Sequence, residues 1–248
     1  MNRYFIYGVG SLMLLLLLCS FDWQKKKLTV WMMGDSTMAI KAANKYPETG
    51  WGVPFATLFN ENVQVNNTAK NGRSTKSFIR EGLWEEVQQG LQQGDYLFIQ
   101  FGHNDEKVDK PNVGVTVDEY KANLALFVQA ARDKEVTPIL LTPIARRSFA
   151  QGKPANTHKA YAEGMIELAD SLDVALIDLT TLTGAMLAEK GEAESMAYFL
   201  HLPEGSTNYP QGVKDNTHLN VEGAEAVAQL VAEALRKQHI PLAKELKK

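Results

Sequence analysis

The sequence is poor in cysteine and has no surplus of basic residues. Its single cysteine, Cys19, excludes an internal disulfide framework and a cysteine-based zinc site. Lysine and arginine number 26 against 29 aspartate and glutamate residues, giving a net charge of -3. Nucleic-acid binders usually carry a basic surplus or stripe, so we expect no nucleic-acid partner. The 45% hydrophobic and 22% charged content is instead typical of a globular protein with a sizeable core.

The apolar run near the N-terminus is too short to cross a bilayer comfortably. Arg3 precedes this run, which covers residues 4–18, whereas a spanning helix needs about 20 apolar residues. The pattern is typical of a secretory signal peptide, so we expect residues 1–19 to direct export to the periplasm or the extracellular space. Cys19 lies where a bacterial lipoprotein carries its lipidated cysteine, although Leu18 is larger than such signals prefer. An ordinary cleaved signal and a lipid anchor at Cys19 both remain open.

Beyond a polar tether at residues 20–27, short apolar runs alternate with amphipathic segments. The runs are 28–33, 62–65, 96–101, 136–141 and 174–179. Runs of this length that contain β-branched and aromatic residues suit strands buried on both faces. Their alternation with helical segments predicts an α/β fold, a parallel sheet with helices on both faces. Because the sequence has no internal repeat or linker, we expect a single domain over residues 28–248.

Two of the intervening segments have the periodicity of amphipathic helices. One should bury Tyr120, Leu124, Phe127 and Ala131, with Asp118 as its N-cap. The last helix should bury Ala224, Val227, Ala228, Val231 and Leu235, with Asn220 as its N-cap. The stretches 106–116 and 194–214 are expected to be long loops near the site, where loops often contribute to specificity.

Four polar blocks follow the predicted strands or precede the last helix. They are Gly34-Asp35-Ser36-Thr37, Asn71-Gly72-Arg73-Ser74, Gly102-His103-Asn104-Asp105 and Asp215-Asn216-Thr217-His218. Ligands of open parallel sheets bind beyond the carboxyl ends of the strands. Any one block alone is more often a turn, a polar loop or the start of a helix. All four blocks in this order favour a common site.

These blocks contain the residue types that acyl transfer requires. Ser36, on a tight turn near the start of the helix expected to follow, needs a base to remove its hydroxyl proton. His218 can be that base, and Asp215 can orient its ring and stabilise the imidazolium. The backbone N–H groups of Ser36 and Gly72 and the side-chain amide of Asn104 can bind the developing oxyanion. Gly72 suits this position because a missing Cβ lets the backbone approach a substrate.

The blocks resemble those of a known family, the SGNH or GDSL-type hydrolases. The segments 34–38, 50–52, 71–75, 100–105, 142–147 and 215–219 are further similar to the rhamnogalacturonan acetylesterase group of that family. This resemblance spans residues 28–237. It implies a three-layer α/β/α sandwich with a flavodoxin-like, five-stranded parallel sheet.

The resemblance also implies roles for individual residues. Ser36 would be the nucleophile, Asp215 and His218 would complete the triad, and Gly72 and Asn104 would complete the oxyanion hole with the Ser36 N–H. No cofactor or metal is implied. The implied activity is removal of O-acetyl groups from an acetylated plant cell-wall polysaccharide, a pectic one such as rhamnogalacturonan. Since such enzymes are also assigned to other acetylated polymers, acetylated xylan is the alternative substrate.

An acetylated galacturonan is anionic, so a substrate cleft should contain cations. Arg73, Arg146 and Arg147 are the candidates, although each can instead anchor a neighbouring loop through ion pairs. Trp51 can stack on a sugar ring or belong to the core. His103 is a further candidate for substrate contact, or a ring that packs beside the site.

Three rival functions remain open. A metal-dependent hydrolase would use ligand types present at His103, Asp105, Asp215 and His218, but would leave Ser36 unexplained. A carbohydrate-binding protein without turnover would leave the triad unexplained. An SGNH lipase or thioesterase would call for an apolar groove, whereas the residues between the blocks are polar.

Overall fold

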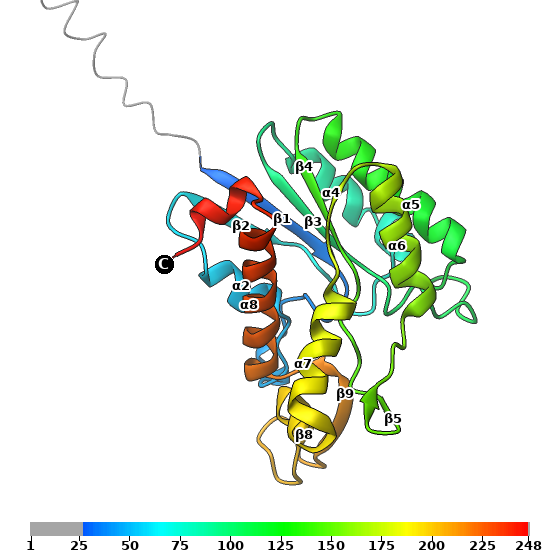
Figure 1. Ribbon diagram of the computed structural model, residues 1–248, viewed down its shortest axis with the longest axis vertical. Coiled ribbons are helices and arrows are strands. Elements are labelled where there is room, and N and C mark those ends of the chain that lie inside the picture. Colours follow the sequence, from blue (N-terminus) through cyan, green and yellow to red (C-terminus); the bar gives the residue numbers. More distant parts are fainter. Residues whose placement is uncertain (1–26, 248) are drawn as a thin grey trace, which may run out of the picture.

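The structure is a computed structural model that describes residues 27–247. Its centre is a five-stranded sheet in the order β2-β1-β3-β4-β7, in which every neighbouring pair is parallel (Figure 1). The strands are β1 (Leu28–Gly34), β2 (Val63–Asn67), β3 (Tyr96–Gln100), β4 (Thr137–Leu141) and β7 (Ala175–Ile177). Each predicted apolar run forms one of these strands. The predicted signal peptide, Cys19 and all of the tether except its last residue lie outside the described residues.

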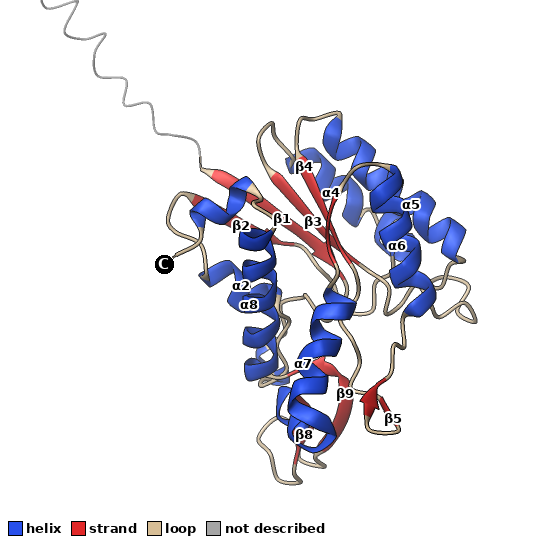
Figure 2. Ribbon diagram, in the orientation of Figure 1, coloured by secondary structure: helices blue, strands red, loops and turns tan. Residues whose placement is uncertain are grey.

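Helices cover both faces of the sheet, so the predicted three-layer architecture is confirmed (Figure 2). One layer contains α2 (Gly52–Thr57), α7 (Leu179–Glu194) and α8 (Val221–Lys237). The other contains α3 (Thr75–Arg80), α4 (Leu83–Gly90), α5 (Val117–Arg132) and α6 (Lys159–Ser171). The smaller elements are η1 (Ala43–Lys45), η2 (Ser195–Tyr198), η3 (Pro241–Glu245), β5 (Phe149–Ala150), β6 (Lys153–Pro154), β8 (Phe199–Leu202) and β9 (Val213–Leu219).

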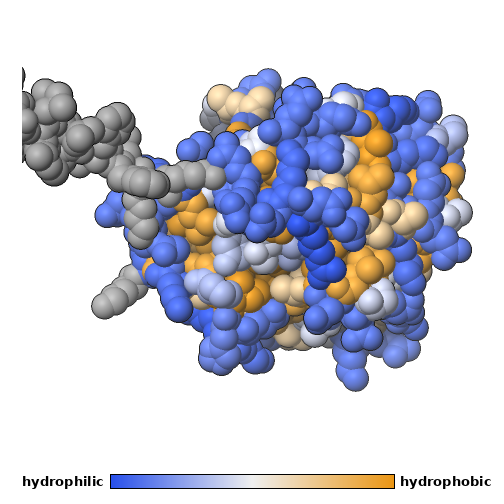
Figure 3. All heavy atoms as spheres, turned by 90° about the horizontal axis from the view of Figure 1, so that it is seen from above, coloured by the Kyte–Doolittle hydropathy of each residue, from blue (hydrophilic) through white to orange (hydrophobic). Residues whose placement is uncertain are grey.

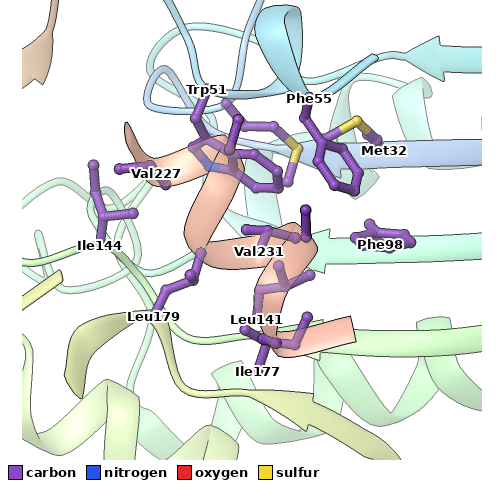
Figure 4. Packing of buried hydrophobic residues seen from close by; sticks show 14 of the residues in the cluster. Met32, Trp51, Phe55, Phe98, Leu141, Ile144, Ile177, Leu179, Val227 and Val231 are labelled. Atoms are coloured by element: carbon purple, nitrogen blue, oxygen red, sulfur yellow. The ribbon is translucent and has the colours of Figure 1, made fainter. Parts of the chain in front are cut away.

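The layer of α2 and α8 shows how the sequence pattern becomes packing. Figure 4 shows Val227 and Val231 of α8 among side chains of the sheet and of α2. The ring of Phe55 in α2 packs against Phe98 of β3, with 5.5 Å between the ring centroids. All four side chains are fully buried. Burying a side chain of this size stabilises the fold by about 1.5–3 kcal/mol. This layer therefore gives stable support to the loops at the edge of the sheet.

The positions predicted to be buried in the two amphipathic helices are buried, but one predicted cap is wrong. The hydroxyl of Thr116, not Asp118, accepts a hydrogen bond from the Glu119 backbone N–H, and the helix begins at Val117. Asp118 instead lies in the first turn, where a negative side chain interacts favourably with the positive end of the helix dipole. Asn220 caps α8 as predicted, since its Oδ1 accepts from the Gly223 N–H at 3.0 Å.

The stretch 194–214 is not one long loop, which corrects the prediction. It contains η2 and β8, and β8 pairs antiparallel with β9 to form a hairpin. Asp215 and His218, which follow this stretch, lie within strand β9. The sequence hides this strand because β9 is mostly polar and half-exposed, so it lacks the apolar run that marks the central strands. The stretch 106–116 contains no helix or strand, as predicted.

The surface seen from above is mainly polar, with apolar side chains gathered in patches (Figure 3). Large exposed hydrophobic residues include Leu126 on α5 and Ile166 on α6. Scattered apolar side chains of this kind are common on globular proteins. Within residues 27–247, no helix combines the length and apolarity needed to cross a membrane.

Candidate active site

The candidate site lies where the order of the sheet reverses. The chain leaves β1 toward β2 on one side, while β3 continues toward β4 on the other, and such a switch point is the usual ligand position in open α/β sheets. Gly34, at the end of β1, pairs with Gln100, at the end of β3, so the first and third blocks emerge side by side. The Lys70 N–H donates to the Gly34 carbonyl at 3.0 Å and brings in the second block.

The turn after β1 is held by its own side chains. Asp35 Oδ1 accepts from the Thr37 N–H at 2.9 Å and from the Thr37 hydroxyl at 2.8 Å. The backbone N–H of Trp51 donates to the Thr37 carbonyl at 2.9 Å. The expectation that Ser36 lies near the start of the following helix is wrong: residues 36–39 form a turn and a bend, and α2 begins only at Gly52.

The turn presents the Ser36 hydroxyl to His218. Ser36 Oγ lies 2.9 Å from His218 Nε2, and His218 Nδ1 lies 2.7 Å from Asp215 Oδ2. Ser36 is 8% exposed, while the side chains of His218 and Asp215 are about 30% exposed. The three residues are thus in hydrogen-bond reach in the order nucleophile, base and carboxylate, which is the geometry that activates a serine hydroxyl.

The environment of Asp215 keeps its carboxylate ionised. Burial opposes ionisation, but hydrogen bonds from the His218 side chain and from the backbone N–H groups of His218 and Thr217 hold the pKa of Asp215 well below its usual range. Asp215 Oδ1 takes both backbone bonds, and Oδ2 is left to the imidazole. The carboxylate therefore fixes the ring with its Nδ1–H toward Asp215 and its Nε2 lone pair toward Ser36.

The first three blocks contain three donors that can bind an oxyanion. Within residues 27–247, the N–H groups of Ser36 and Gly72 donate to no protein acceptor. Gly72 has a φ of +76°, in the left-handed region where glycine is favoured, and it is exposed. Asn104 Nδ2 donates one N–H to the Arg73 carbonyl at 3.0 Å, which leaves its second N–H available.

A buried lysine joins the first two of these segments. Lys41 Nζ lies 2.6 Å from the Ser36 carbonyl, 2.8 Å from Asn71 Oδ1 and 2.7 Å from Glu48 Oε1. Its side chain is 4% exposed, and these acceptors match the three N–H groups of the ammonium. Lys41 therefore holds the serine turn against the loop that carries Gly72.

Arg147 anchors the triad strand rather than pointing free into solvent. Its backbone N–H donates to the Asn216 carbonyl at 2.8 Å, and its Nη1 donates to Asn216 Oδ1 at 3.1 Å. Its Nη2 donates to the Glu192 carbonyl. Because Asn216 follows Asp215, these bonds fix the segment that carries the aspartate of the triad.

Arg73 and Arg146 are also engaged by protein groups. The Arg73 guanidinium pairs with Glu81 at 2.7 Å, and Arg146 pairs with Glu106 at 2.6 Å. Their side chains are 39% and 23% exposed, respectively. Both arginines thus act as loop anchors, and their contact with an anionic substrate stays a prediction.

Trp51 and His103 lie in the interior, which removes them from the candidate substrate-binding residues. Trp51 is fully buried, and its Nε1 donates to Gln100 Oε1 at 2.9 Å. His103 is 2% exposed and packs edge-on against His158 at 4.3 Å between ring centroids. Burial holds the pKa of His103 well below its ordinary value. The alternatives of a core tryptophan and a packing histidine are what the structure shows.

Several residues at the site carry no motif signal in the sequence. Besides Lys41, they are Glu106, Lys107 and His158. Glu106 bonds His158 Nδ1 at 2.8 Å, and although burial alone would raise the pKa of Glu106, His158 and Arg146 hold it below its usual value. Glu106 and Lys107 follow the third block directly, and that adjacency is the only sequence signal for them.

Asp105 closes the third block from inside the protein. Its Oδ1 accepts from the Thr75 N–H at 2.8 Å and from the Thr75 hydroxyl at 2.6 Å, which joins the loop after β3 to the start of α3. Its Oδ2 is buried and has no partner among the described residues. Burial raises the pKa of Asp105 to about 7.

Because Asp105 is buried, we expect wild type to lose stability as the pH rises, and we expect Asp105→Asn to remove this part of the pH dependence. The unfolded chain ionises Asp105 near the ordinary aspartate pKa of 3.8, whereas the folded chain holds the proton to about 7. Wild type should therefore lose stability relative to Asp105→Asn as the pH rises through this range, with no further change above it. At about 1.4 kcal/mol per pKa unit, the difference should reach a few kcal/mol.

Urea unfolding of both proteins between pH 4 and pH 8 tests this prediction. The asparagine of the variant can keep the Oδ1 bonds to Thr75, so the pH dependence of the difference, not its absolute size, is the informative quantity. Asp35, whose pKa burial also raises, is present in both proteins and cancels in first order. Free energies of unfolding that run parallel across the pH range would contradict the prediction.

The ligand types proposed for a metal site do not gather around one position. Among the described residues, no group of three or more histidine, cysteine, aspartate or glutamate side chains is arranged to hold a metal ion. Asp215 and His218 bond each other, while Asp105 bonds Thr75. Three of the four residues of this rival site are thus bonded to other protein groups, and the fourth, His103, is buried against His158.

The parallel α/β/α fold and the hydrogen-bonded Ser36, His218 and Asp215 define a carboxylic ester hydrolase. Residues 32–226 match the model of the GDSL-like lipase/acylhydrolase family. The chain belongs to this family, and the resemblance drawn from the four blocks is confirmed.

Two similar proteins from Bacillus subtilis (strain 168) cover most of the chain. The rhamnogalacturonan acetylesterase RhgT is 40% identical over 220 residues, which cover 88% of this chain and 94% of RhgT. The probable rhamnogalacturonan acetylesterase YesY is 33% identical over 214 residues, covering 86% and 94%.

Solved structures support the fold. The protein YxiM from Bacillus subtilis superposes with a TM-score of 0.74 at 24% identity, covering 86% of this chain and 57% of that one. The acetylxylan esterase Axe2 from Geobacillus stearothermophilus gives 0.61 at 19% identity, covering 85% and 96%. At these identities the structural likeness concerns the fold alone.

Proposed function

We propose that this protein is a serine acetylesterase that removes O-acetyl groups from rhamnogalacturonan. The observation that carries the proposal is the Ser36–His218–Asp215 array at 2.9 and 2.7 Å, set in a chain that is 40% identical to RhgT. The likeness to RhgT covers 88% of this chain, and the array together with its proposed oxyanion donors draws on all four blocks.

In the proposed reaction, Ser36 Oγ attacks the acetyl carbonyl carbon while His218 Nε2 accepts the hydroxyl proton. The negative oxygen of the tetrahedral intermediate binds the N–H groups of Ser36 and Gly72 and the second N–H of Asn104. Each such donor contributes about 10²–10³-fold to the rate. Collapse breaks the C–O bond to the sugar, and His218 returns the proton to the sugar oxygen. A water molecule, deprotonated by His218, then hydrolyses the acetyl-enzyme and releases acetate.

The proposed substrate suits a site that is open at its rim. His218 and Asp215 are partly exposed on strand β9, and Gly72 is exposed. A polymer can therefore reach Ser36 from outside while its acetyl group enters the oxyanion hole. Arg73 and Arg146 keep part of their side chains exposed and remain the proposed contacts for a galacturonate carboxylate.

We also propose that the protein works outside the cytoplasm. The signal-like run 4–18 supports export, and an acetylated cell-wall polysaccharide would be met in the periplasm or the extracellular space. Cys19 offers a lipid anchor that would tether the enzyme to a membrane.

Acetate release from acetylated rhamnogalacturonan, measured beside acetylated xylan, tests the proposed substrate. We expect faster release from rhamnogalacturonan and no release above background with Ser36→Ala. Faster release from xylan would keep the esterase and discard the pectic substrate. Cleavage of an octanoyl aryl ester faster than the acetyl ester would favour a lipase or thioesterase instead.

A further inference from the structure

The side-chain amide of Asn104 is held from both of its ends. Lys107 Nζ donates to Asn104 Oδ1 at 2.6 Å, and Asn104 Nδ2 donates to the Arg73 carbonyl at 3.0 Å. An ammonium can only donate, and a carbonyl can only accept. These two partners therefore permit one orientation of the amide, in which Nδ2 keeps one N–H free of protein acceptors.

The free N–H matters because Asn104 is the only oxyanion donor of the proposed three that belongs to a side chain. The donors on Ser36 and Gly72 are backbone groups, whose directions are fixed by the turns that carry them. A side-chain amide can rotate, and a displacement of about 1 Å at a catalytic group can cost about 10²-fold in rate. A group that locks this amide therefore acts on the reaction itself.

The charge of Lys107 adds a second effect. A hydrogen bond from a charged donor to an amide oxygen is stronger than a neutral one, and it polarises the amide so that its N–H groups donate more strongly. Burial, Lys110 and Arg146 lower the pKa of Lys107, whereas the charges of Asp35 and Glu106 act in the opposite direction and favour the ammonium.

The loop around Lys107 is built to hold its backbone. The Lys107 N–H donates to the Asn104 carbonyl at 3.1 Å, and the Lys110 N–H donates to the Lys107 carbonyl at 2.8 Å. A Cβ on Gly114 would lie 1.9 Å from the Lys107 carbonyl oxygen, so only glycine lets the segment fold back this closely. The stretch 106–116 thus presents the Lys107 side chain to Asn104 from a fixed point.

We propose that Lys107 is a positioning residue of the oxyanion hole, which orients and polarises the Asn104 amide through its 2.6 Å hydrogen bond to Oδ1. This inference rests on the proposed role of Asn104 in the esterase reaction. Lys107 does not contact the reacting atoms in this role, and it acts only through Asn104.

The test uses the full chain and the uncharged substrate 4-nitrophenyl acetate, which has no carboxylate that a lysine can bind. Lys107→Met should lower kcat and kcat/KM by the same factor, between about tenfold and a hundredfold. Lys110→Met, three residues along the same exposed loop, removes an equal charge and should leave both values within twofold. Lys107→Arg, which keeps a charged donor, should retain more activity than Lys107→Met.

A double-mutant cycle identifies the partner. Asn104→Ala alone should lower kcat about 10²–10³-fold. In that background Lys107→Met should cost nothing further, because the group through which Lys107 acts is already absent. Melting temperatures of all variants show whether a lower activity comes from unfolded protein or from a slower reaction. Activity retained by the Lys107→Arg variant, which keeps a charged donor, gives a second control for the same question.

Three results would overturn the inference. An unchanged kcat on 4-nitrophenyl acetate with a raised KM on acetylated rhamnogalacturonan would make Lys107 a substrate-binding residue instead. An equal loss from Lys107→Met with and without Asn104 would place its effect elsewhere. Full activity of Asn104→Ala would overturn the proposed oxyanion role of Asn104 itself, a failure that is distinguishable from the other two.

Discussion

Ser36→Ala is expected to lower kcat by about six orders of magnitude, because the variant has no atom that can form the acetyl-enzyme. The residual rate should still exceed that of water alone, since Gly72, Asn104 and the backbone N–H of residue 36 can bind the oxyanion when water attacks directly. Hydrolysis of 4-nitrophenyl acetate at high enzyme concentration measures this loss.

The substitution should leave the fold intact, which makes the result interpretable. The Ser36 hydroxyl makes one hydrogen bond, to His218 Nε2, and Ser36 lies on a turn held by Asp35 and Thr37. We therefore expect a melting temperature within a few degrees of wild type. Ser171→Ala, at the end of α6, is the matched control and should keep full activity. Substantial activity in verified Ser36→Ala protein would rule out the serine mechanism.

The sequence was sufficient to predict the layers of the fold because the central strands are short apolar runs. Leu97, Phe98 and Ile99 of β3 are fully buried, and a strand covered on both faces requires such an uninterrupted run. The hairpin of β8 and β9 could not be found in this way. Its strand β9 has one buried residue, Leu219, and its sequence carries the polar side chains of the site.

The same contrast separates the predicted site residues from those that were missed. Ser36, Asn104 and His218 were found because each lies in a short block at the end of a strand or close before the last helix. Lys41 lies 5 residues beyond Ser36 in the chain, and its role depends on Asn71, 30 residues away. Contacts of this kind form only when separate loops meet in the folded chain, so no local sequence pattern predicts them.

For residues whose role the sequence left open between two interpretations, burial and hydrogen bonding in the structure select one of them. Trp51 has the chemistry to stack on a sugar, but its indole N–H is committed to Gln100 inside the core. Arg147 has the charge to bind a carboxylate, but its hydrogen bonds to Asn216 make it a support for the triad strand. Residue type sets what a side chain can do, and the packing around it sets which of those tasks remains available.

Asp215→Asn is expected to lower kcat by about 10⁴-fold although it changes a single heavy atom. In wild type, Asp215 Oδ1 accepts from the N–H groups of Thr217 and His218, and Oδ2 accepts from His218 Nδ1. The asparagine side chain of the variant has only one acceptor oxygen, and the two backbone donors require it. Its NH₂ group must then face Nδ1.

This arrangement inverts the tautomer of His218. Facing an NH₂ donor, Nδ1 becomes an acceptor, and the neutral ring carries its proton on Nε2. Nε2 lies 2.9 Å from Ser36 Oγ, where it must have a lone pair to remove the hydroxyl proton. The variant thus keeps all three side chains in place while the base is unable to act.

Asp215→Ala tests this reasoning against simple loss of charge. Alanine also removes the carboxylate but presents no donor to Nδ1, so the ring can still adopt the productive tautomer with water as its partner. We expect Asp215→Asn to be at least as inactive as Asp215→Ala on 4-nitrophenyl acetate, with both proteins folded. Activity of the asparagine variant well above that of the alanine variant would show that an inverted His218 tautomer is not what inactivates the asparagine variant.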